Sequence, residues 1–105
     1  MCGIVGIVGE KISKEKVVGV LKRLEYRGYD SAGIAYLEDK AIKRYRCKGD
    51  IKTLNDKIKN IELNTNICLG HTRWATHGRP SEENAHPHID CTGKITVVHN
   101  GIIEN

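Results

Sequence analysis

The chain has 105 residues, a hydrophobic fraction of 39%, a charged fraction of 29% and a net charge of +4. This composition is that of one folded domain, or part of one, rather than of a disordered segment. The basic residues are spread out, without a run of five like charges and without interleaved aromatic residues, which argues against a nucleic-acid-binding surface. No apolar stretch is long enough to span a membrane. Neither nucleic acid nor a membrane is therefore expected as a partner.

Cysteine usage points to a reducing compartment. The four cysteines are Cys2, Cys47, Cys68 and Cys91, and no two of them have the C-x-x-C spacing of redox and zinc motifs. The opening sequence MCGIVGIVGEK lacks the charged region and the long apolar core of a secretion signal. We therefore expect a cytoplasmic protein with reduced thiols.

The first third of the chain predicts a strand followed by a helix. Glycines alternate with β-branched residues over 2–9, which is typical of a buried strand. Ser13 predicts the N-cap of a helix, since Val17 and Leu21 lie on one apolar face after it. Gly28 is a natural end for this helix.

The middle of the chain predicts a hairpin, a helix and a short strand. Residues 31–37 and 41–48 have the pattern of two strands, joined by a turn at 38–40. Asp50 predicts the N-cap of a second helix, whose apolar positions are Ile51, Leu54, Ile58 and Ile61. The short apolar stretch 67–69 predicts a further strand.

The last third predicts a long loop and a final strand. Residues 77–93 contain two glycines and two prolines and predict a polar loop, whereas 94–99 predict a strand. The predicted order is β-α-β-β-α-β-loop-β, which indicates an α/β or α+β fold. Ile102 and Ile103 look like the beginning of another element, so we expect the sequence to cover a domain only in part.

Cys2 is a candidate nucleophile. Methionine is commonly removed before a small second residue, which would expose the α-amino group of Cys2. This amine has a reference pKa of about 7.7–8.0 and a thiol about 8.5, so the amine can act as general base for the thiol. The alternative is a buried residue at the start of a strand, with Met1 retained.

Asn100 and Gly101 are candidates for an oxyanion hole. A side-chain amide and an unhindered backbone N–H in adjacent positions can stabilise the oxyanion that forms when a thiolate attacks an amide. The alternative is an ordinary Asn-Gly turn.

The stretch HTRWATHG at 71–78 predicts a binding site directly after a strand. Arg73 can bind a carboxylate through two parallel hydrogen bonds. Thr76 and His77 can add further hydrogen bonds, and Trp74 can form an apolar wall. The alternative is that Trp74 belongs to the core and that the other residues form a solvated loop.

A metal site is the competing interpretation. Six potential zinc ligands lie within 24 residues, namely Cys68, His71, His77, His86, His88 and Cys91. Their spacing matches no zinc motif, and an extended chain would point the rings of His86 and His88 to opposite sides. We therefore expect neither a metal nor another cofactor.

Four blocks of the sequence resemble the N-terminal glutaminase domain of the glucosamine-6-phosphate synthase family, the isomerising glutamine–fructose-6-phosphate transaminases. They are CGIVGIVG at 2–9, LEYRGYDSAGIA at 24–35, HTRWATHGRPSEENAHPH at 71–88 and VVHNGIIEN at 97–105. They occur in the family's order and cover nearly the whole chain. The resemblance implies that 1–105 are a partial class II glutamine amidotransferase domain. Its α+β N-terminal-nucleophile hydrolase fold is a four-layer α-β-β-α sandwich, which this chain covers only in part.

The resemblance assigns the chemistry to three residues. Cys2 would attack the side-chain amide of glutamine, with its own α-amino group as base, giving a γ-glutamyl thioester and ammonia. Water would then release glutamate. Asn100 and Gly101 would form the oxyanion hole.

The resemblance also assigns the binding of L-glutamine. Arg73 would bind the α-carboxylate, Thr76 and His77 would line the pocket, and Trp74 would lie toward the partner domain where ammonia leaves. His86 is similar to a residue near the site, without a chemical step of its own.

Two parts of the family's enzyme lie beyond the sequence. An acidic residue that holds the glutamine α-amino group follows NGIIEN in the family, and so does the isomerase domain that converts fructose 6-phosphate to glucosamine 6-phosphate. The implied partners are L-glutamine and this remainder, in the same or another chain, and the parent enzyme is expected to be a homo-oligomer. The alternatives are an inactive fragment, a piece that works with a complementing chain, and a non-catalytic glutamine-binding remnant.

Overall fold

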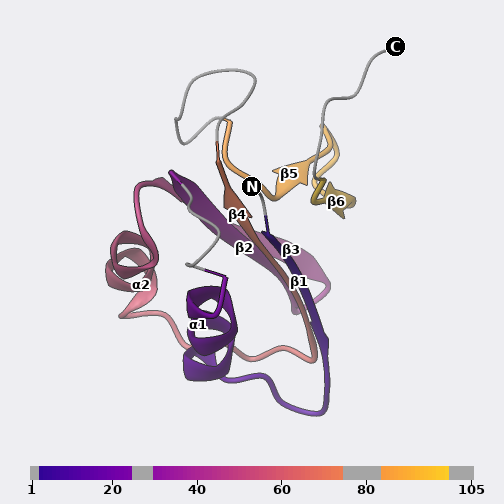
Figure 1. Ribbon diagram of the computed structural model, residues 1–105. Coiled ribbons are helices and arrows are strands. Elements are labelled where there is room, and N and C mark those ends of the chain that lie inside the picture. Colours follow the sequence, from indigo (N-terminus) through magenta and orange to yellow (C-terminus); the bar gives the residue numbers. More distant parts are fainter. Residues whose placement is uncertain (1–2, 25–29, 75–83, 100–105) are drawn as a thin grey trace.

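A computed structural model of the chain describes residues 3–24, 30–74 and 84–99 (Figure 1). Its elements are β1 (Gly3–Val8), α1 (Lys14–Lys22), β2 (Ser31–Glu38), β3 (Ala41–Lys48), α2 (Ile51–Ile58), β4 (Ile67–Arg73), β5 (His88–Ile89) and β6 (Thr96–Val97). Both sheets are antiparallel, and the two helices lie between strands in the sequence. This is an α+β fold, as predicted.

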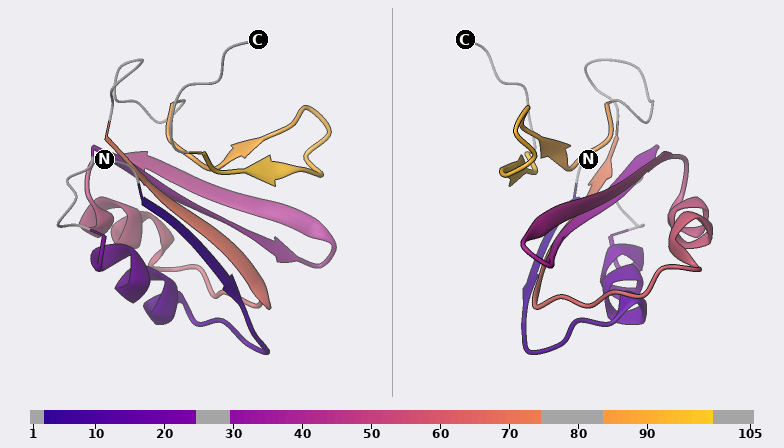
Figure 2. Two further views of the ribbon diagram at one scale, coloured as in Figure 1. Left: turned by 45° about the vertical axis from the view of Figure 1, so that its right-hand side comes forward. Right: turned by 180° about the vertical axis from the view of Figure 1, so that it is seen from behind.

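The main sheet has four strands in the order β1-β4-β2-β3, so that β4 lies between β1 and β2. The helices α1 and α2 cover one face of this sheet, and the small sheet of β5 and β6 lies over the opposite face (Figure 2). We call these the helix face and the hairpin face. The result is a helix layer, a sheet layer and a small second sheet.

Both predicted helix caps are present. The Ser13 Oγ accepts a hydrogen bond from the backbone N–H of Lys16 at 3.1 Å, and the Asp50 Oδ1 accepts one from Thr53 at 2.9 Å. Each bond satisfies an N–H group that has no partner inside the helix. α1 ends at Lys22, whereas the predicted end at Gly28 lies outside the described residues.

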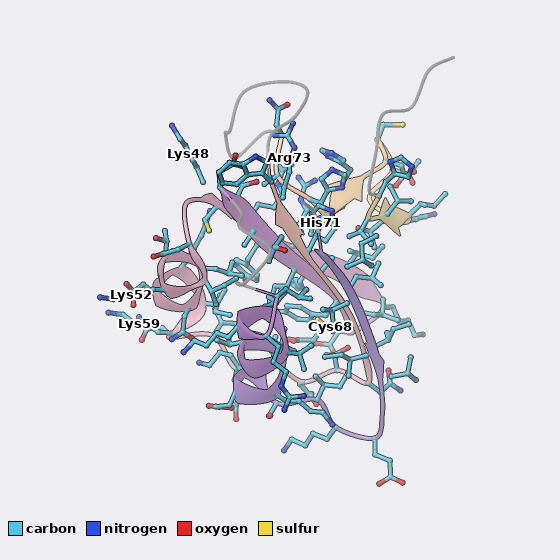
Figure 3. The ribbon with its side chains drawn as sticks, in the orientation of Figure 1. Lys48, Lys52, Lys59, Cys68, His71 and Arg73 are labelled. Atoms are coloured by element: carbon cyan, nitrogen blue, oxygen red, sulfur yellow. The ribbon has the colours of Figure 1, made fainter. Side chains whose placement is uncertain are left out.

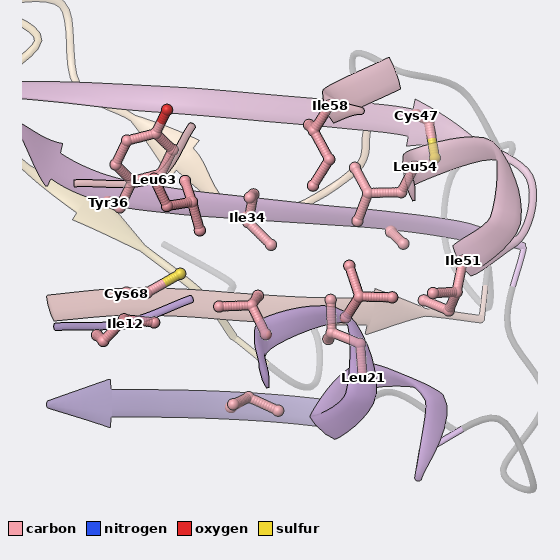
Figure 4. Close-up of a cluster of buried hydrophobic side chains, with 14 residues drawn as sticks. Ile12, Leu21, Ile34, Tyr36, Cys47, Ile51, Leu54, Ile58, Leu63 and Cys68 are labelled. Atoms are coloured by element: carbon pink, nitrogen blue, oxygen red, sulfur yellow. The ribbon is translucent and has the colours of Figure 1, made fainter. Parts of the chain in front are cut away.

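The hydrophobic core lies between the helix face and the two helices (Figure 4). It contains Val5, Ile12, Val17, Val18, Leu21, Ala32, Ile34, Tyr36, Cys47, Ile51, Leu54, Ile58, Leu63 and Cys68. The periodic positions Val17, Leu21, Ile51, Leu54 and Ile58 are all in this cluster, as their spacing predicts. In the described part of the chain, no helix is long and apolar enough to cross a membrane.

The prediction that the strand after 67 ends at 69 is wrong, because β4 continues to Arg73. His71 and Thr72 are fully buried in it. Their polar side chains are typical of a loop, but β4 is flanked by strands on both sides, and β1 and β2 supply its backbone hydrogen bonds. The position of β4 in the sheet therefore overrides the polarity of its sequence.

The predicted loop over 77–93 is also corrected within its described part. His88 and Ile89 form β5, and Ala85 and Pro87 are buried. The last strand is shorter than the predicted 94–99, because only Thr96 and Val97 pair with β5. Residues 84–89 thus pack over the sheet, whereas residues 91–95 are exposed, as expected of a polar loop.

Candidate functional site

The candidate site lies at the end of the main sheet where β4 finishes. Arg73 is the last residue of β4 and pairs with Ser31 of β2. On the other side of β4, Gly3 pairs with Thr72. The residue that follows Cys2 is therefore paired with the residue that precedes Arg73. Figure 3 shows Arg73 at this end of the sheet and His71 further along the same strand.

Three of the eight predicted site residues fall in the described part of the chain. Arg73 is half-buried, and Trp74 directly after it is 48% exposed, so the alternative that Trp74 belongs to the core is wrong. His86 is half-buried under the β5–β6 hairpin. The other five, Cys2, Thr76, His77, Asn100 and Gly101, lie outside the described residues.

A stack of three histidine rings connects the sheet to the hairpin. His71 is fully buried, and its ring centroid lies 4.1 Å from that of His86 in a stacked arrangement. The ring of His88 lies 4.3 Å from that of His86. Because the two rings are in contact, the segment does not have the extended conformation that would point His86 and His88 to opposite sides. The His86–Pro87 peptide bond is cis. Even so, no three His, Cys, Asp or Glu side chains among the described residues could together hold a metal ion.

The environment keeps two of these rings neutral. Burial lowers the pKa of His86 to about 3, and neighbouring His71, His88 and Arg73 add to this effect. Burial, together with the charges of nearby arginines, also lowers the pKa of His88. At neutral pH both rings are uncharged, so they act in hydrogen bonding and stacking rather than as cations.

Long-range contacts hold the histidine segment on the hairpin face. The Arg46 Nη1 donates to the carbonyl of Ala85 at 3.1 Å, and the Arg44 Nη1 donates to the carbonyl of Pro87 at 3.4 Å. A Cβ atom on Gly33 would lie 2.0 Å from the carbonyl oxygen of His86, so only glycine permits this approach. Our sequence analysis missed these three positions. A glycine inside a strand is a signal for close backbone approach, but it does not say which segment approaches.

Several buried polar atoms lie at the same end of the sheet. The Ser31 Oγ, the Thr72 Oγ1 and the His86 Nδ1 have no hydrogen-bond partner among the described residues. Buried polar groups are costly unless a hydrogen bond satisfies them. Thr72 alternates with Arg73 along β4 and faces the helices, so only the Ser31 and His86 groups lie on the same face as Arg73. Together with the guanidinium of Arg73, these two groups suit a polar ligand or further polypeptide, and the guanidinium in particular suits a carboxylate.

A separate groove lies between the hairpin face and the β5–β6 hairpin. It encloses about 480 Å³, and aliphatic side chains form most of its wall, including Leu37, Ile42, Ile67, Leu69 and Ile95. Arg73, Trp74 and His86, the three predicted site residues that the structure describes, do not line it. Among the described residues, its lining contains no thiol and no carboxylate, so the candidate site remains the Arg73 end of the sheet.

Comparison with known proteins identifies relatives of this chain. No family model matches it. The isomerizing glutamine–fructose-6-phosphate aminotransferases of Pyrococcus horikoshii, Thermotoga maritima and Sulfolobus acidocaldarius are 58%, 58% and 54% identical to it over 105, 107 and 108 residues. These alignments cover 100% of the chain but only 18%, 17% and 18% of the relatives. The chain therefore spans less than a fifth of their length.

A solved structure supports the fold. The B. subtilis glutamine phosphoribosylpyrophosphate amidotransferase, complexed with ADP and GMP, superposes with a TM-score of 0.67 over 84% of this chain and 18% of that chain. The sequence identity of 23% limits this likeness to the fold. The chain is therefore homologous over its whole length to about 18% of the glutamine–fructose-6-phosphate aminotransferases, at the N-terminal end of these enzymes, and its α+β fold is similar to that of the B. subtilis glutamine phosphoribosylpyrophosphate amidotransferase.

Proposed function

We propose that this chain carries the nucleophile and the carboxylate-binding part of a glutamine amidotransferase. The observation that supports this most directly is the pairing of Gly3 with Thr72. If the ladder of β1 and β4 extends by one residue, Cys2 lies opposite Arg73. A nucleophile and a cation that binds the substrate would then be neighbours across two strands.

The proposed reaction begins with the thiol of Cys2 after Met1 is removed. The α-amino group of Cys2 takes the thiol proton, and the sulfur attacks the side-chain carbonyl carbon of L-glutamine. Asn100 and Gly101 donate hydrogen bonds to the oxyanion that forms. The proton then passes to the amide nitrogen, ammonia leaves, and a γ-glutamyl thioester remains. Water hydrolyses the thioester, which releases glutamate and restores the thiol.

Substrate recognition is assigned to the stretch that begins at Arg73. The Arg73 guanidinium is half-buried beside the neutral ring of His86, and it would bind the α-carboxylate with two parallel hydrogen bonds. Thr76 and His77 would line the pocket. Trp74, which is 48% exposed, would face the domain that receives ammonia.

We further propose that a longer protein or complex containing this chain would catalyse the whole aminotransferase reaction of its relatives. Ammonia would pass to an isomerase domain, in the same or another chain of a homo-oligomer, and would convert fructose 6-phosphate to glucosamine 6-phosphate. The reaction would occur in the cytoplasm, where thiols stay reduced. The buried Ser31 hydroxyl has no hydrogen-bond partner among the described residues. It favours a second candidate function, in which the chain turns over only with a complementing chain.

The experiment is intact-mass analysis with an electrophilic glutamine analogue. The Cys91→Ser chain is used so that the exposed thiol of Cys91 cannot react. Loss of the Met1 mass and one adduct that Cys2→Ala abolishes would support the proposal. An adduct formed only after addition of the remaining part of a relative would support the complementation reading. Retained Met1 with reversible glutamine binding would contradict the catalytic proposal and support a binding remnant.

Arg73→Lys tests the binding role. A single ammonium cannot reproduce the two parallel hydrogen bonds of a guanidinium, so we expect the analogue concentration for half-maximal labelling to rise about tenfold, with the folded state retained. Arg23→Lys makes the same change at an exposed arginine directly after α1. It is the matched control and should leave this concentration nearly unchanged. Equal behaviour of the two variants would contradict the assignment of Arg73.

A further inference from the structure

His71 is a buried polar residue that has no role in the proposed reaction. It lies in the central strand β4, two residues before Arg73, and it is fully buried. An apolar side chain could fill the same space without the cost of burying ring nitrogens. The contacts of the ring therefore indicate why a histidine rather than an apolar residue occupies this position.

One ring nitrogen of His71 reaches the end of the described chain. The Nε2 atom lies 3.1 Å from the carbonyl oxygen of His99. A carbonyl oxygen can only accept a hydrogen bond, so Nε2 carries the proton and donates it. The bond joins two residues that are 28 positions apart.

The stack described above fixes the ring in this orientation. The ring of His86 lies 4.1 Å away and nearly parallel, with an interplanar angle of 24°. Gly33 holds the backbone of His86 against the sheet, because its hydrogen leaves room for the His86 carbonyl. The His71 ring is thus clamped between its own strand and the His86 segment.

The carbonyl of His99 and the N–H of residue 100 belong to one planar peptide group. A hydrogen bond that fixes the His99 oxygen therefore fixes the plane from which residue 100 begins. We propose that His71 is a positioning residue, which holds the 99–100 peptide group and so sets the orientation of Asn100. The benefit to catalysis rests on the proposed function, in which Asn100 binds the oxyanion.

Two variants separate the hydrogen bond from simple filling of the core. His71→Gln carries an amide N–H₂ that reaches the position of Nε2, whereas the same group in His71→Asn falls one carbon short. We expect a backbone order parameter at the nitrogen of residue 100 of about 0.85 in the unmodified chain and in His71→Gln, and below about 0.6 in His71→Asn. A low value in the unmodified chain, or equal values in all three chains, would overturn the proposal.

The contact can also be tested without a variant, in case His71→Asn does not fold. A scalar coupling through the hydrogen bond, from the Nε2 of His71 to the carbonyl carbon of His99, supports the proposal if it is detected in the unmodified chain. Exchange of the Nε2 proton with water too fast for its detection would show that no such bond is held, and would overturn it.

Labelling of Cys2 distinguishes failure of this inference from failure of the proposed function. We expect the electrophilic glutamine analogue to react about tenfold more slowly with His71→Asn, and at nearly the original rate with His71→Gln, because small displacements of catalytic groups slow a reaction strongly. Iodoacetamide should modify Cys2 equally in all three chains. If the analogue fails to label the unmodified chain, the proposed function fails, and the relaxation and coupling measurements alone decide the role of His71.

Discussion

The two faces of the four-stranded sheet differ in how they are covered. On the helix face, Ile34 is fully buried beneath the two helices, together with Leu54 and Ile58 of α2. On the hairpin face, Ile4 is 46% exposed and Val8 is 80% exposed, whereas the polar His71 is fully buried. One face therefore holds the apolar core, and the other buries a polar residue and ends at Arg73, the proposed carboxylate-binding residue.

The difference teaches that stability and proposed function are separated across one sheet. The helix face is covered by helices that lie between the strands in sequence, so their own apolar periodicity is sufficient to close it. The hairpin face is covered by the late segment 84–99, which glycine packing and two arginine–carbonyl bonds hold in place. Substitutions should therefore act on different properties according to the face that they change.

The largest expected effect is on the helix face. Ile34→Ala removes a fully buried side chain from the middle of the sheet, and we expect the free energy of unfolding to fall by about 2–5 kcal/mol. Ile95→Ala makes the same change at a side chain of the hairpin that is 61% exposed, and it should cost less than about 1 kcal/mol. Urea unfolding measures both. Equal losses would contradict the contrast between the two regions.

A smaller loss of stability is expected when Gly33, which contacts the hairpin segment, is replaced by alanine. In Gly33→Ala, the new Cβ would lie 2.0 Å from the His86 carbonyl oxygen, so the His86 segment must shift. We expect a loss of about 1–3 kcal/mol in the free energy of unfolding and changed imidazole resonances of His71 and His86.

Gly6→Ala is the matched control for this substitution. Gly6 lies in β1 and its added Cβ would meet only Leu69, at an ordinary 3.9 Å. The imidazole resonances should remain unchanged in this variant, as recorded by NMR. If Gly33→Ala also left them unchanged, the close approach of the His86 backbone to β2 would be refuted.

Replacement of Lys14 should lower stability without changing the hairpin face, because its contacts lie within the helix layer. Its Nζ donates to the carbonyl oxygens of Ile58, Lys59 and Ile61 at 3.3, 2.8 and 2.9 Å, at the carboxyl end of α2. Lys14→Met should lower the free energy of unfolding by about 1–2 kcal/mol, through lost hydrogen bonds and lost interaction with the helix dipole. Lys16→Met, at an exposed position of α1, should change it by less than about 0.5 kcal/mol. The imidazole resonances on the hairpin face should be the same in both variants.

A further expected effect, which depends on the conditions rather than on a lost contact, is the pH dependence that His86 adds. Burial lowers the pKa of His86 in the folded state to about 3, below the value of about 6.5 in the unfolded chain. As the pH falls, the unfolded chain binds the proton before the folded chain does. The free energy of unfolding therefore keeps its full value above about pH 6.5 and decreases progressively as the pH falls toward 3. Urea midpoints between pH 7 and 4 should fall less steeply for His86→Gln than for the unmodified chain. Parallel curves would show that His86 is not held neutral.

The helix face could be predicted from sequence because its signals are local. The caps Ser13 and Asp50 and the apolar spacing of Leu21 and Leu54 each lie within a few residues of the structure that they specify. The extent of β4 could not be predicted, because His71 is ordered by neighbouring strands that are distant in sequence. Burial of a polar residue depends on what surrounds it, and a short window of sequence does not contain that information.

The candidate site could be predicted in part. The stretch from 71 indicated a carboxylate-binding arginine, and the structure places Arg73 at the end of a strand that pairs with the strand that follows Cys2. The stacking of His86 on His71 could not be foreseen, because it depends on the glycine at 33 and on the arginines of β3. The assignments of Cys2 and Asn100 remain predictions from the sequence.

The central claim is that Cys2 is a nucleophile beside a glutamine-binding arginine, and the chain contains its own reference thiol. Cys91 is exposed in the hairpin region, whereas Cys68 is buried and burial raises its pKa to about 11. The most direct measurement is peptide mapping of the unmodified chain after brief exposure to an electrophilic glutamine analogue, with and without L-glutamine. The account predicts an adduct at Cys2 that L-glutamine suppresses, with little at Cys91. Modification of Cys91 at the same rate as Cys2, without protection by L-glutamine, would contradict it.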